Sequence, residues 1–396
     1  MTAAPVADWV DPATMAADPY PTYRRLIEES PVAWVPALRR YLVTSYELCN
    51  AIENDQQTFT ASVTGPGATM ERALGGRPML RKDDPEHAAD RVAINPTLRP
   101  RSLRTTWKPI FEATARRYLA VLLEKGPDAA NLDQDFAAPV ASQNLIDLIG
   151  IPQATPEDMR RWSSSLIAGI SNLEDDAQIW ARSEQAQTEI ESALDELIPR
   201  YRATPDSSIL SALSNSGLPR ENIAANVKLA ISGGMNEPQH AITTSVFALD
   251  GHPDQLAAVR ADPGLWPVVF DESIRWISPI GMYPRQTTVD TNLGGVKLPV
   301  DASIGVVVGA ANRDPASIAN AGTFDLGRTK TPHLAFGSGV HLCAGHWAAR
   351  ISIGEVALPL LYDELPGFRI DSRRETTFTG WVFRGASQLP VTWNTH

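Results

Sequence analysis

The fold of this chain is decided by one short stretch of sequence, Phe336-Gly337-Ser338-Gly339-Val340-His341-Leu342-Cys343-Ala344-Gly345, which stands at the start of a helical pattern. A cysteine that ligates a metal must be a thiolate, and the positive potential of a helix N-terminus lowers the pKa of a thiol. Glycines let the backbone approach a flat cofactor closely, and an aromatic ring such as Phe336 shields the sulfur from water. A single cysteine, taken alone, is more often a small buried apolar residue. The residues around Cys343 must therefore indicate whether it is a metal ligand or a small buried apolar residue.

The spacing Phe-Gly-x-Gly-x-x-x-Cys-x-Gly resembles the haem-binding loop of the cytochrome P450 superfamily, in its soluble bacterial form. The resemblance implies haem b with Cys343 as the axial thiolate ligand, and contacts to the cofactor from Phe336, Gly337 and Gly345. It implies a mainly α fold with a small β component. This fold would form a single triangular-prism-like domain over residues 1–396, with the haem between a long distal helix and the cysteine-ligand helix. The implied activity is that of a monooxygenase that uses dioxygen and a reduced partner.

Three further residues match the superfamily in the expected order. Glu272-Ser-Ile-Arg275 resembles the Glu-x-x-Arg helix motif, and residues three apart on a helix face each other. A lone pair of this kind is usually exposed and weak. Arg328 matches the third member of the buried Glu-Arg-Arg cluster of the superfamily. The resemblance assigns Glu272, Arg275 and Arg328 to folding rather than to chemistry.

Four cations stand where similar proteins bind the two haem propionates. His87 and Arg91 are four positions apart and therefore share one helical face. Arg285 lies ten residues after Arg275, and His341 lies two residues before the cysteine. Each could instead be an ordinary surface cation, but four in register favour a propionate-binding role.

The helix expected over residues 220–249 resembles the long distal helix of the superfamily, with one departure. Gly233 would open room for dioxygen and substrate. Asn236 and Glu237 then stand where the superfamily usually carries an acid and a threonine. Pro238 lacks an N–H and is expected to kink or widen the helix beside Glu237. Two alternatives stay open: Glu237 delivers protons to bound dioxygen, or it points elsewhere and water alone delivers them.

Two short motifs narrow the resemblance to aryl-ether O-demethylases of the guaiacol type. They are Glu237-Pro-Gln-His240 and Gly380-Trp-Val-Phe-Arg-Gly385. The implied substrates are small lignin-derived methoxyarenes such as guaiacol, 4-alkylguaiacols or methoxybenzoates, with formaldehyde as a product. By the same resemblance the pocket would be lined by segments 63–80, 166–170, 229–233 and 280–283 and by the C-terminal hairpin, all mainly apolar. The expected substrate residues are Leu80, Leu166, Ile167, Ile170, Ile280, Tyr283 and Phe383.

Other functions remain open at this point. The haem loop is compatible with a hydroxylase of a terpenoid, fatty acid or natural product. The carboxylate of Glu237 suggests peroxide-driven oxygenation, and the departure at Asn236 and Glu237 leaves open a haem protein that does no turnover. Arg81 and Lys82 could attract a carboxylated substrate, although a solvated pair is the simpler expectation. Arg99, Arg101, Arg104 and Lys108 could form a docking patch for a redox partner, or simply a solvated face.

Composition sets the remaining bounds. The chain has 396 residues, of which 43% are hydrophobic and 20% charged, and its formal net charge is −11. This balance disfavours nucleic acid and anionic membrane surfaces as partners. Two cysteines are too few for a disulfide framework, and no run is long enough to span a membrane, so we expect a cytoplasmic protein. Electrons would come from a separate protein, either an iron–sulfur flavoprotein reductase or a ferredoxin with its reductase.

Apolar periodicity gives the expected order of elements. Helices are expected over residues 21–29, 85–126, 137–150, 155–172, 177–201, 220–249, 253–276 (two helices) and 343–361. Short strands are expected within residues 33–44, 285–308 and 376–393. Long loops are expected over residues 63–81 and 312–340.

Overall fold

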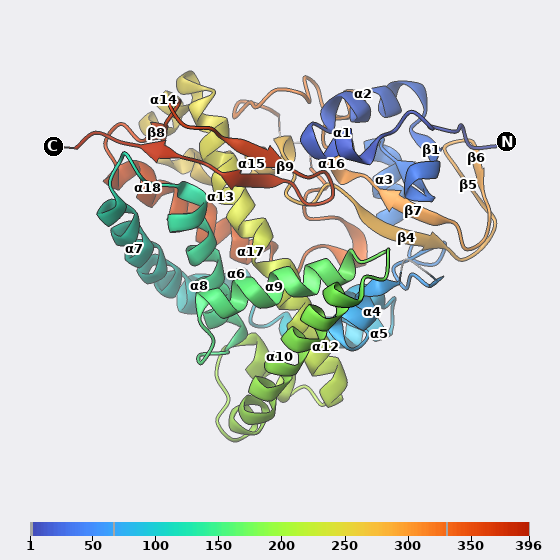
Figure 1. Ribbon diagram of the computed structural model, residues 1–396, viewed down its shortest axis with the longest axis horizontal. Helices are drawn as coiled ribbons and strands as arrows, with labels where there is room; N and C mark the ends of the chain where they lie inside the picture. Colours follow the sequence, from blue (N-terminus) through green and yellow to red (C-terminus); the bar gives the residue numbers. More distant parts are fainter. Residues whose placement is uncertain (1–2, 66–67, 330–331, 396) are drawn as a thin grey trace.

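The structure is a computed structural model, and it describes residues 3–65, 68–329 and 332–395. Its outline is triangular, with α10 at one corner and the two ends of the chain near the other two (Figure 1). Helices fill most of the molecule, while the strands gather on the side of the N-terminus and along one edge. The mainly helical fold with a small β component is thereby confirmed.

Helices account for most of the chain, and several begin or end where the sequence carries a known signal. Thr155 caps one helix with Asp158 three residues later, and Gly150 ends the preceding helix in a left-handed conformation. The α-helices are α1 (Pro12–Ala17), α2 (Tyr20–Glu29), α3 (Tyr46–Glu53), α4 (Thr69–Leu74), α5 (Glu86–Ile94), α6 (Pro100–Ser102), α7 (Lys108–Lys125), α8 (Ala138–Ile149), α9 (Pro156–Ile170), α10 (Ala177–Ala203), α11 (Ile209–Ser214), α12 (Arg220–Gly234), α13 (Asn236–Asp250), α14 (Pro253–Ala261), α15 (Trp266–Trp276), α16 (Val308–Ala311), α17 (His346–Ala349) and α18 (Leu358–Glu364).

Shorter helical segments of other pitch extend or join these helices. The π-helical segments are η4 (Leu103–Trp107), η5 (Asp133–Ala137) and η8 (Arg350–Ala357). The 3-10 segments are η1 (Pro36–Leu38), η3 (Met79–Arg81), η6 (Pro263–Leu265) and η7 (Gly339–His341). Because η8 joins α17 to α18 without interruption, one long helix follows the cysteine loop, as its apolar pattern indicates.

The strands form one five-stranded sheet and three two-stranded ones. The large sheet has the order β1-β2-β7-β4-β3, in which only β2 and β7 run parallel. The strands are β1 (Val32–Val35), β2 (Arg40–Val43), β3 (Phe59–Thr60), β4 (Tyr283–Thr287), β5 (Thr291–Leu293), β6 (Val296–Leu298), β7 (Ser303–Val306), β8 (Arg369–Ile370), β9 (Thr377–Thr379), β10 (Gly385–Gln388) and β11 (Val391–Thr392). The sheet brings strands from residues 32–60 beside strands from residues 283–306, and Tyr283 at the start of β4 lies beside Gly337 of the cysteine loop.

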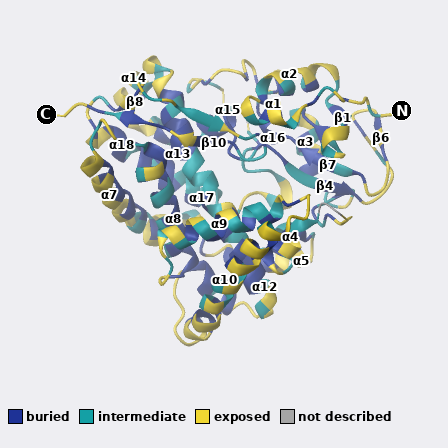
Figure 2. Cartoon of the chain, in the orientation of Figure 1, coloured by how far each residue is buried: buried dark blue, intermediate teal, exposed yellow. Residues whose placement is uncertain are grey.

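The largest apolar core lies among the helices, and α13 runs through it from one edge of the molecule to the centre (Figure 1). Figure 2 shows α13, α18 and the inner faces of their neighbours buried, whereas the outer faces of α7 and α10 are exposed. Two smaller cores cover the two faces of the large sheet, one with α3 and the other with α1 and α2. None of the helices in the described ranges combines the length and apolar composition that a membrane span requires.

Four expectations about local structure are wrong. Residues 63–81 are not a plain loop, because α4 and η3 lie within them; residues 66 and 67 of that stretch lie outside the described part. The helix after the cysteine begins at His346, not at Cys343. The helix expected over residues 220–249 is broken at Met235. Residues 376–393 do not form one hairpin, since β11 pairs with β8 and only β9 pairs with β10.

Candidate active site

The loop that carries Cys343 is held in shape by its backbone. The Cys343 N–H donates to the carbonyl of Phe336 at 2.9 Å. Gly337 and Gly339 adopt φ values of 68° and 63°, and a Cβ at Gly339 would lie 2.1 Å from the carbonyl oxygen of Glu53. Only glycine fits such a left-handed position with so close a backbone neighbour. The glycine spacing of the sequence is therefore what allows this loop to lie against the end of α3.

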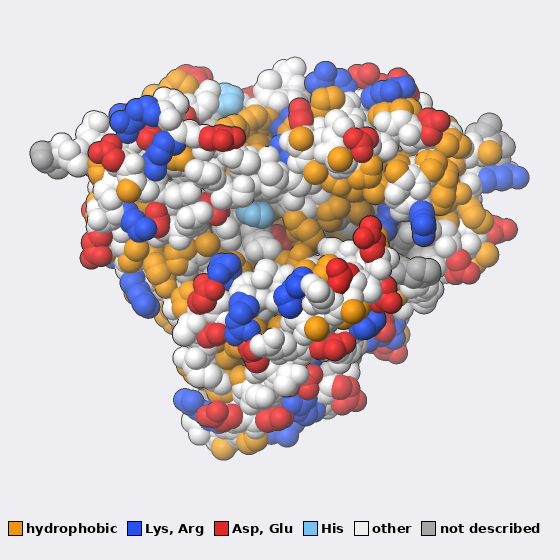
Figure 3. All heavy atoms as spheres, in the orientation of Figure 1, with side chains coloured by type: hydrophobic (Ala, Val, Ile, Leu, Met, Phe, Trp, Pro, Cys, Tyr) orange, Lys and Arg blue, Asp and Glu red, His pale blue; other side chains and the backbone are white. Residues whose placement is uncertain are grey.

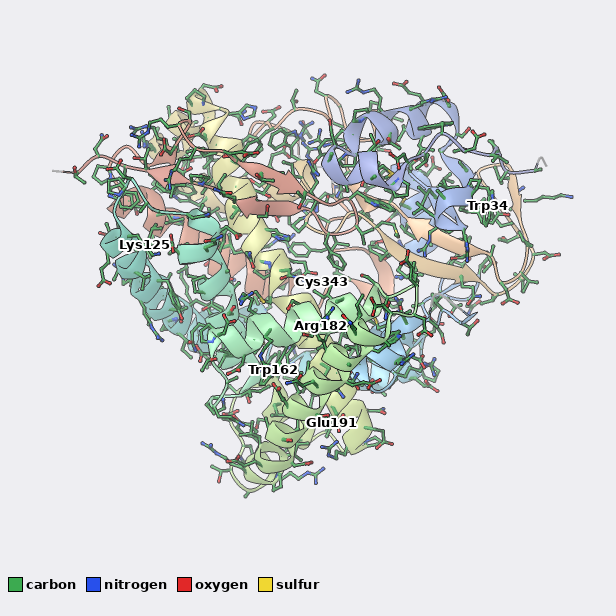
Figure 4. All side chains as sticks on the ribbon, in the orientation of Figure 1. Trp34, Lys125, Trp162, Arg182, Glu191 and Cys343 are labelled. Carbon is green, nitrogen blue, oxygen red and sulfur yellow. The ribbon has the colours of Figure 1, made fainter. Side chains whose placement is uncertain are left out.

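Cys343 lies near the centre of the view in Figure 4, and its side chain is exposed rather than packed. Enough protein surrounds it that burial raises the pKa of the thiol. The Gly345 backbone N–H, Arg91 and Arg350 act in the opposite direction, and Glu237 acts with the burial. The Glu237 carboxyl is thus within electrostatic range of the sulfur. Positive groups directed at an unpacked cysteine suit a thiolate that ligates a metal.

Phe336 lies where the sequence indicates a shield for the sulfur. The guanidinium carbon of Arg350 is 4.8 Å from the centroid of the Phe336 ring, and the Phe270 ring is 6.2 Å away. A Cβ at Gly345 would approach the Cys343 sulfur to 3.9 Å. The loop therefore presents one aromatic face and one glycine to the surroundings of the thiol.

The four cations expected to bind propionates lie together. The rings of His87 and His341 have their centroids 4.4 Å apart. Burial lowers the pKa of both imidazoles, with further lowering of His341 by Arg285 and of His87 by Arg91. These mutual effects link all four side chains into one cluster, which we call the cationic cluster. Arg91 also acts on Cys343, so the cluster borders the cysteine loop.

The polar groups around the cationic cluster fit a haem with two propionates. Arg285 Nη2 lies 2.9 Å from Glu53 Oε1, and both side chains are buried. His341 Nε2 is 3.8 Å from Asp83 Oδ1, too far for a hydrogen bond, and within the described ranges this buried nitrogen has no other partner. A buried donor without a partner, beside several cations, matches the carboxylate oxygens of a propionate. The donor set and the thiol together fit haem.

The three residues assigned to folding form one buried ionic cluster. Arg275 donates to both carboxylate oxygens of Glu272 at 2.7 Å, and Arg328 Nε lies 3.2 Å from Glu272 Oε1. Arg275 also donates to the backbone carbonyls of Asn312, Ala321 and Thr323, each within 2.9 Å. The cluster fastens α15 to the chain segment that precedes the cysteine loop.

The distal helix is interrupted beside its acidic residue. Helix α12 ends at Gly234 and α13 begins at Asn236. Pro238 cannot donate to the Gly234 carbonyl, which is the reason for the break at this point. A Cβ at Gly233 would meet no atom within 4 Å, whereas one at Gly234 would lie 2.8 Å from Leu145 Cδ1. Gly233 therefore faces open space and Gly234 serves the packing of α12 against α8.

Glu237 and His240 are two residues with buried polar atoms, three positions apart on α13. Both Glu237 oxygens and His240 Nδ1 are buried, with no hydrogen-bond partner in the described part of the chain. Burial raises the pKa of Glu237 to about 8 and lowers that of His240 to about 4, so both groups are neutral near pH 7. The His240 ring lies so close to Gly385 that a Cβ there would be 2.1 Å from its Cδ2 atom. The two short motifs noted in the sequence thus touch each other.

The segments expected to line the pocket lie around a shared region. Ile280 pairs with Phe383 in an isolated β-bridge, and α13 packs against β10 of the same hairpin. On the other side, α9 packs against both α4 and α12. Leu166 is fully buried, while the other six expected substrate residues are partly exposed: Leu80, Ile167, Ile170, Ile280, Tyr283 and Phe383. Figure 3 shows a hollow beside α9 in which hydrophobic side chains gather.

Arg81 and Lys82 are not a solvated pair, contrary to the simpler expectation. Their exposed fractions are 6% and 5%. Lys82 Nζ lies 2.7 Å from Asp90 Oδ2, so this lysine belongs to a buried ion pair. Arg81 has no such partner in the described ranges. The chain buries both residues because η3 packs against α5 and α12.

Two residues of the site are not predicted as site residues by the sequence. Glu53, at the end of α3, holds Arg285 and touches the cysteine loop, but no pattern distinguishes it from other helical glutamates. His240 was noted only as part of a motif, and its contact with Gly385 joins segments far apart in the sequence. The co-occurrence of the two motifs in one chain was the available signal for that contact.

Known proteins resemble this chain over nearly its whole length. The cytochrome P450 family profile matches residues 265–358. Pentalenic acid synthase of Streptomyces avermitilis is 30% identical over 411 residues, covering 98% of each chain. The 6-deoxyerythronolide B hydroxylase of Saccharopolyspora erythraea is 28% identical over 398 residues, covering 94% of this chain and 96% of its own. The crystal structure of P450BioI in complex with an acyl carrier protein superimposes with a TM-score of 0.86 and 27% identity, covering 95% of this chain and 99% of that one.

Proposed function

Because this chain belongs to the cytochrome P450 family, we propose that it O-demethylates small methoxyarenes of the kind released from lignin, such as guaiacol, 4-alkylguaiacols or methoxybenzoates. It is a cytochrome P450 monooxygenase, whose family uses haem b with a cysteine thiolate as axial ligand and receives electrons from partner proteins. We assign the axial thiolate to Cys343 and the propionates to the cationic cluster.

The observation that carries the proposed substrate class is the contact between His240 and Gly385. The Glu-Pro-x-His motif of α13 and the Gly380–Gly385 motif of the C-terminal hairpin are the features by which this sequence resembles aryl-ether O-demethylases. The two motifs are in direct contact, because the His240 imidazole of the first motif occupies the space that a side chain at Gly385 of the second would take. This shared contact lies next to Phe383, at the edge of the proposed pocket.

The reaction divides the work between the cofactor and the chain. Haem, when bound and reduced, supplies the oxidising power that inserts one oxygen atom of dioxygen into a C–H bond. Insertion into a methoxy C–H bond gives a hemiacetal, whose C–O bond breaks to leave a phenol and formaldehyde. The Cys343 loop shields and orients the sulfur. Gly233 leaves room for the reacting methyl group on the distal side.

Glu237 is the proposed source of protons for dioxygen reduction. Its carboxyl is held neutral by burial and lies within electrostatic range of Cys343, hence on the side of the helix that faces the cofactor site. A neutral carboxyl can donate a proton where a carboxylate cannot. The break between α12 and α13 frees backbone groups beside Glu237 that can bind water. Asn236, next to the break, is placed to bind the same water.

A second candidate function is hydroxylation of a terpenoid, fatty acid or other natural product. The observation that favours it is that the relatives of this chain include a pentalenic acid synthase and a 6-deoxyerythronolide B hydroxylase. The cysteine loop and the cationic cluster are equally compatible with this activity. The two candidate functions differ only in what the pocket must bind, so the identity of the bound substrate distinguishes them.

A separate redox partner is part of the proposal, as an iron–sulfur flavoprotein reductase or a ferredoxin with its reductase. Arg99 and Arg101 are exposed. Arg104 Nη2 and Lys108 Nζ lie 2.8 and 3.3 Å from the carboxylate of Glu355 in η8, on the helix that follows the cysteine loop. A partner that approaches this helix would meet Arg99 and Arg101 as exposed cations that form no ion pair with any described residue, whereas Arg104 and Lys108 are already partly neutralised.

The test is a spectral titration of the ferric, haem-loaded protein, which needs no partner. The panel contains guaiacol, a 4-alkylguaiacol, 4-methoxybenzoate, a fatty acid and a terpene. We expect a shift from low spin to high spin with methoxyarenes, and release of formaldehyde when a reductase system is added. A shift confined to the fatty acid or the terpene would overturn the O-demethylase proposal in favour of the hydroxylase.

A further inference from the structure

Arg81 is a buried cation whose hydrogen-bonding capacity is almost unused. It ends η3, and only 6% of its surface is exposed. A guanidinium carries five N–H donors. In the part of the chain that the structure describes, the Arg81 guanidinium makes one hydrogen bond, a long one of 3.4 Å from Nη1 to the Ala61 carbonyl, and no ion pair. Buried arginines are normally paired, so Arg81 lacks an anion.

The neighbouring charges make this deficit larger. Burial, then the charge of Arg285 and that of Arg40 lower the pKa of Arg81 to about 10, while the charge of Glu71 acts in the opposite direction, so Arg81 remains a cation at neutral pH. The nearby carboxylates have other partners. Glu53 lies 2.9 Å from Arg285, and Glu71 lies 3.9 Å from Arg77. Among the residues that the structure describes, Arg81 and Arg40 therefore have no carboxylate within ion-pair distance.

The next residue shows that the fold can neutralise a buried cation at this place. Lys82 is as deeply buried as Arg81 and is fully paired, with Asp90 Oδ2 at 2.7 Å. Asn226 donates to the same carboxylate oxygen at 3.0 Å. The unpaired state of Arg81 is thus a property of its own position and not of the segment.

Arg81 lies beside the proposed substrate pocket. It directly follows Leu80, and its guanidinium is directed to Ala61, the residue after β3, which is the strand paired with β4. Strand β4 begins at Tyr283, whose ring centroid is 5.1 Å from the guanidinium carbon of Arg285. Arg40 reaches the sulfur of Met282 at 4.0 Å. Arg40 and Arg285 therefore contact the stretch Met282–Tyr283, and Arg81 lies within electrostatic range of both arginines.

We propose that Arg81 binds a carboxylate group of the substrate, so that among methoxyarenes the enzyme prefers methoxybenzoates. The inference rests on the proposed function and makes its substrate class narrower. An arginine fork and a carboxylate form two parallel charge-assisted hydrogen bonds, which hold a planar ring in one orientation. Haem propionates offer the same chemistry, but the cationic cluster already provides four other groups for them. The experiment separates the two sources.

The first measurement compares 4-methoxybenzoate with 4-methoxybenzamide, its uncharged near-isostere, by spectral titration of the haem-loaded protein. Charge-assisted hydrogen bonds of this kind correspond to about a 10- to 100-fold difference in Kd, and we expect the carboxylate to bind more tightly by that factor. Arg81→Met should remove this preference and leave guaiacol affinity unchanged. Arg81→Lys, which keeps the charge but not the fork, should retain part of it.

Arg72→Met is the matched control, because Arg72 is an exposed arginine of α4 in the same segment, paired with Asp175 at 3.0 Å. It should leave the preference intact. Equal Kd values for the two ligands in the wild type would overturn the inference even if Arg81→Met did not fold. So would an Arg81→Met protein that keeps the preference. Equal weakening of both ligands, with loss of haem, would assign Arg81 to a propionate instead.

Failure of the inference and failure of the proposed function have different signatures. If guaiacol binds and releases formaldehyde while the carboxylate gives no advantage, only the role of Arg81 is wrong. If no methoxyarene shifts the spin state, the O-demethylase proposal fails and the inference fails with it.

Discussion

Glutamine at position 237 provides the sharpest test of the distal site. Glu237→Gln keeps the shape of the side chain and removes its ability to ionise. Burial holds the pKa of Glu237 at about 8, against an ordinary value of 4.5. Between these two pH values the folded wild type retains a proton that the unfolded chain has released. The stability linked to the neutral form is therefore complete below about pH 4.5 and is lost as the pH rises towards 8.

The size of the effect follows from the same two values. At 1.36 kcal/mol per pH unit, the difference amounts to ~5 kcal/mol as an upper bound. Buried sites in proteins behave as if their dielectric constant were higher than that of a dry medium, so we expect about half of this upper bound, ~2–3 kcal/mol. The free energy of unfolding of Glu237→Gln minus that of the wild type should rise by this amount between about pH 4.5 and pH 8. Above pH 8 the difference should stay constant.

The assay is urea unfolding of the haem-loaded proteins across this pH range. Glu355→Gln is the control with the opposite sign. Burial acts to raise the pKa of Glu355, but hydrogen bonds from Arg104 and Lys108 outweigh it and lower the pKa. Measured to below pH 4.5 as well, the Glu355→Gln protein should therefore lose stability relative to the wild type as the pH rises towards 4.5, and the difference should then stay constant up to pH 8. A difference for Glu237→Gln that stays flat with pH would refute the claim that Glu237 is neutral at pH 7.

Three other substitutions test the framework of the site. Arg275→Lys cannot reproduce the fork to Glu272 and the carbonyl contacts, and should cost ~3–5 kcal/mol in urea unfolding; a loss below about 1 kcal/mol would contradict a shared buried cluster. Gly339→Ala should lower the haem-to-protein ratio, because its Cβ would collide with the Glu53 carbonyl; full haem loading would show that the loop can move. Gly385→Ala should destabilise the protein by ~1–3 kcal/mol, and adding His240→Ala should restore much of the loss if the contact between them is the cause.

The parts of the fold that were predictable from sequence carry local signals. Thr155 and Asp158 mark a helix start and Gly150 a helix end, and the structure has both. Gly337 and Gly339, before Cys343, are required by backbone geometry at the positions where they occur. The Glu-x-x-Arg pair was predictable because its two members are neighbours on one helix.

The parts that were not predictable depend on contacts between distant segments or on local energy balances. Helix α4 is only six residues long and lies between glycines, so apolar periodicity cannot reveal it. The ion pair of Glu53 with Arg285 needs the sheet register before it can be inferred. The burial of Arg81 contradicts the general rule that charged residues face solvent. The sequence signal at Pro238 predicted a disturbed helix near Glu237 but not a complete break at Met235.

Gly233 and Gly234 differ in a way that matters for redesign of the enzyme. They are adjacent in the sequence and would look interchangeable in an alignment. A methyl group added at Gly233 enters open space, whereas one added at Gly234 collides with Leu145. If Gly233 borders the reaction chamber as proposed, the volume of that chamber can be reduced there in small steps, through alanine and then serine, without disturbing the scaffold. Gly234 offers no such freedom.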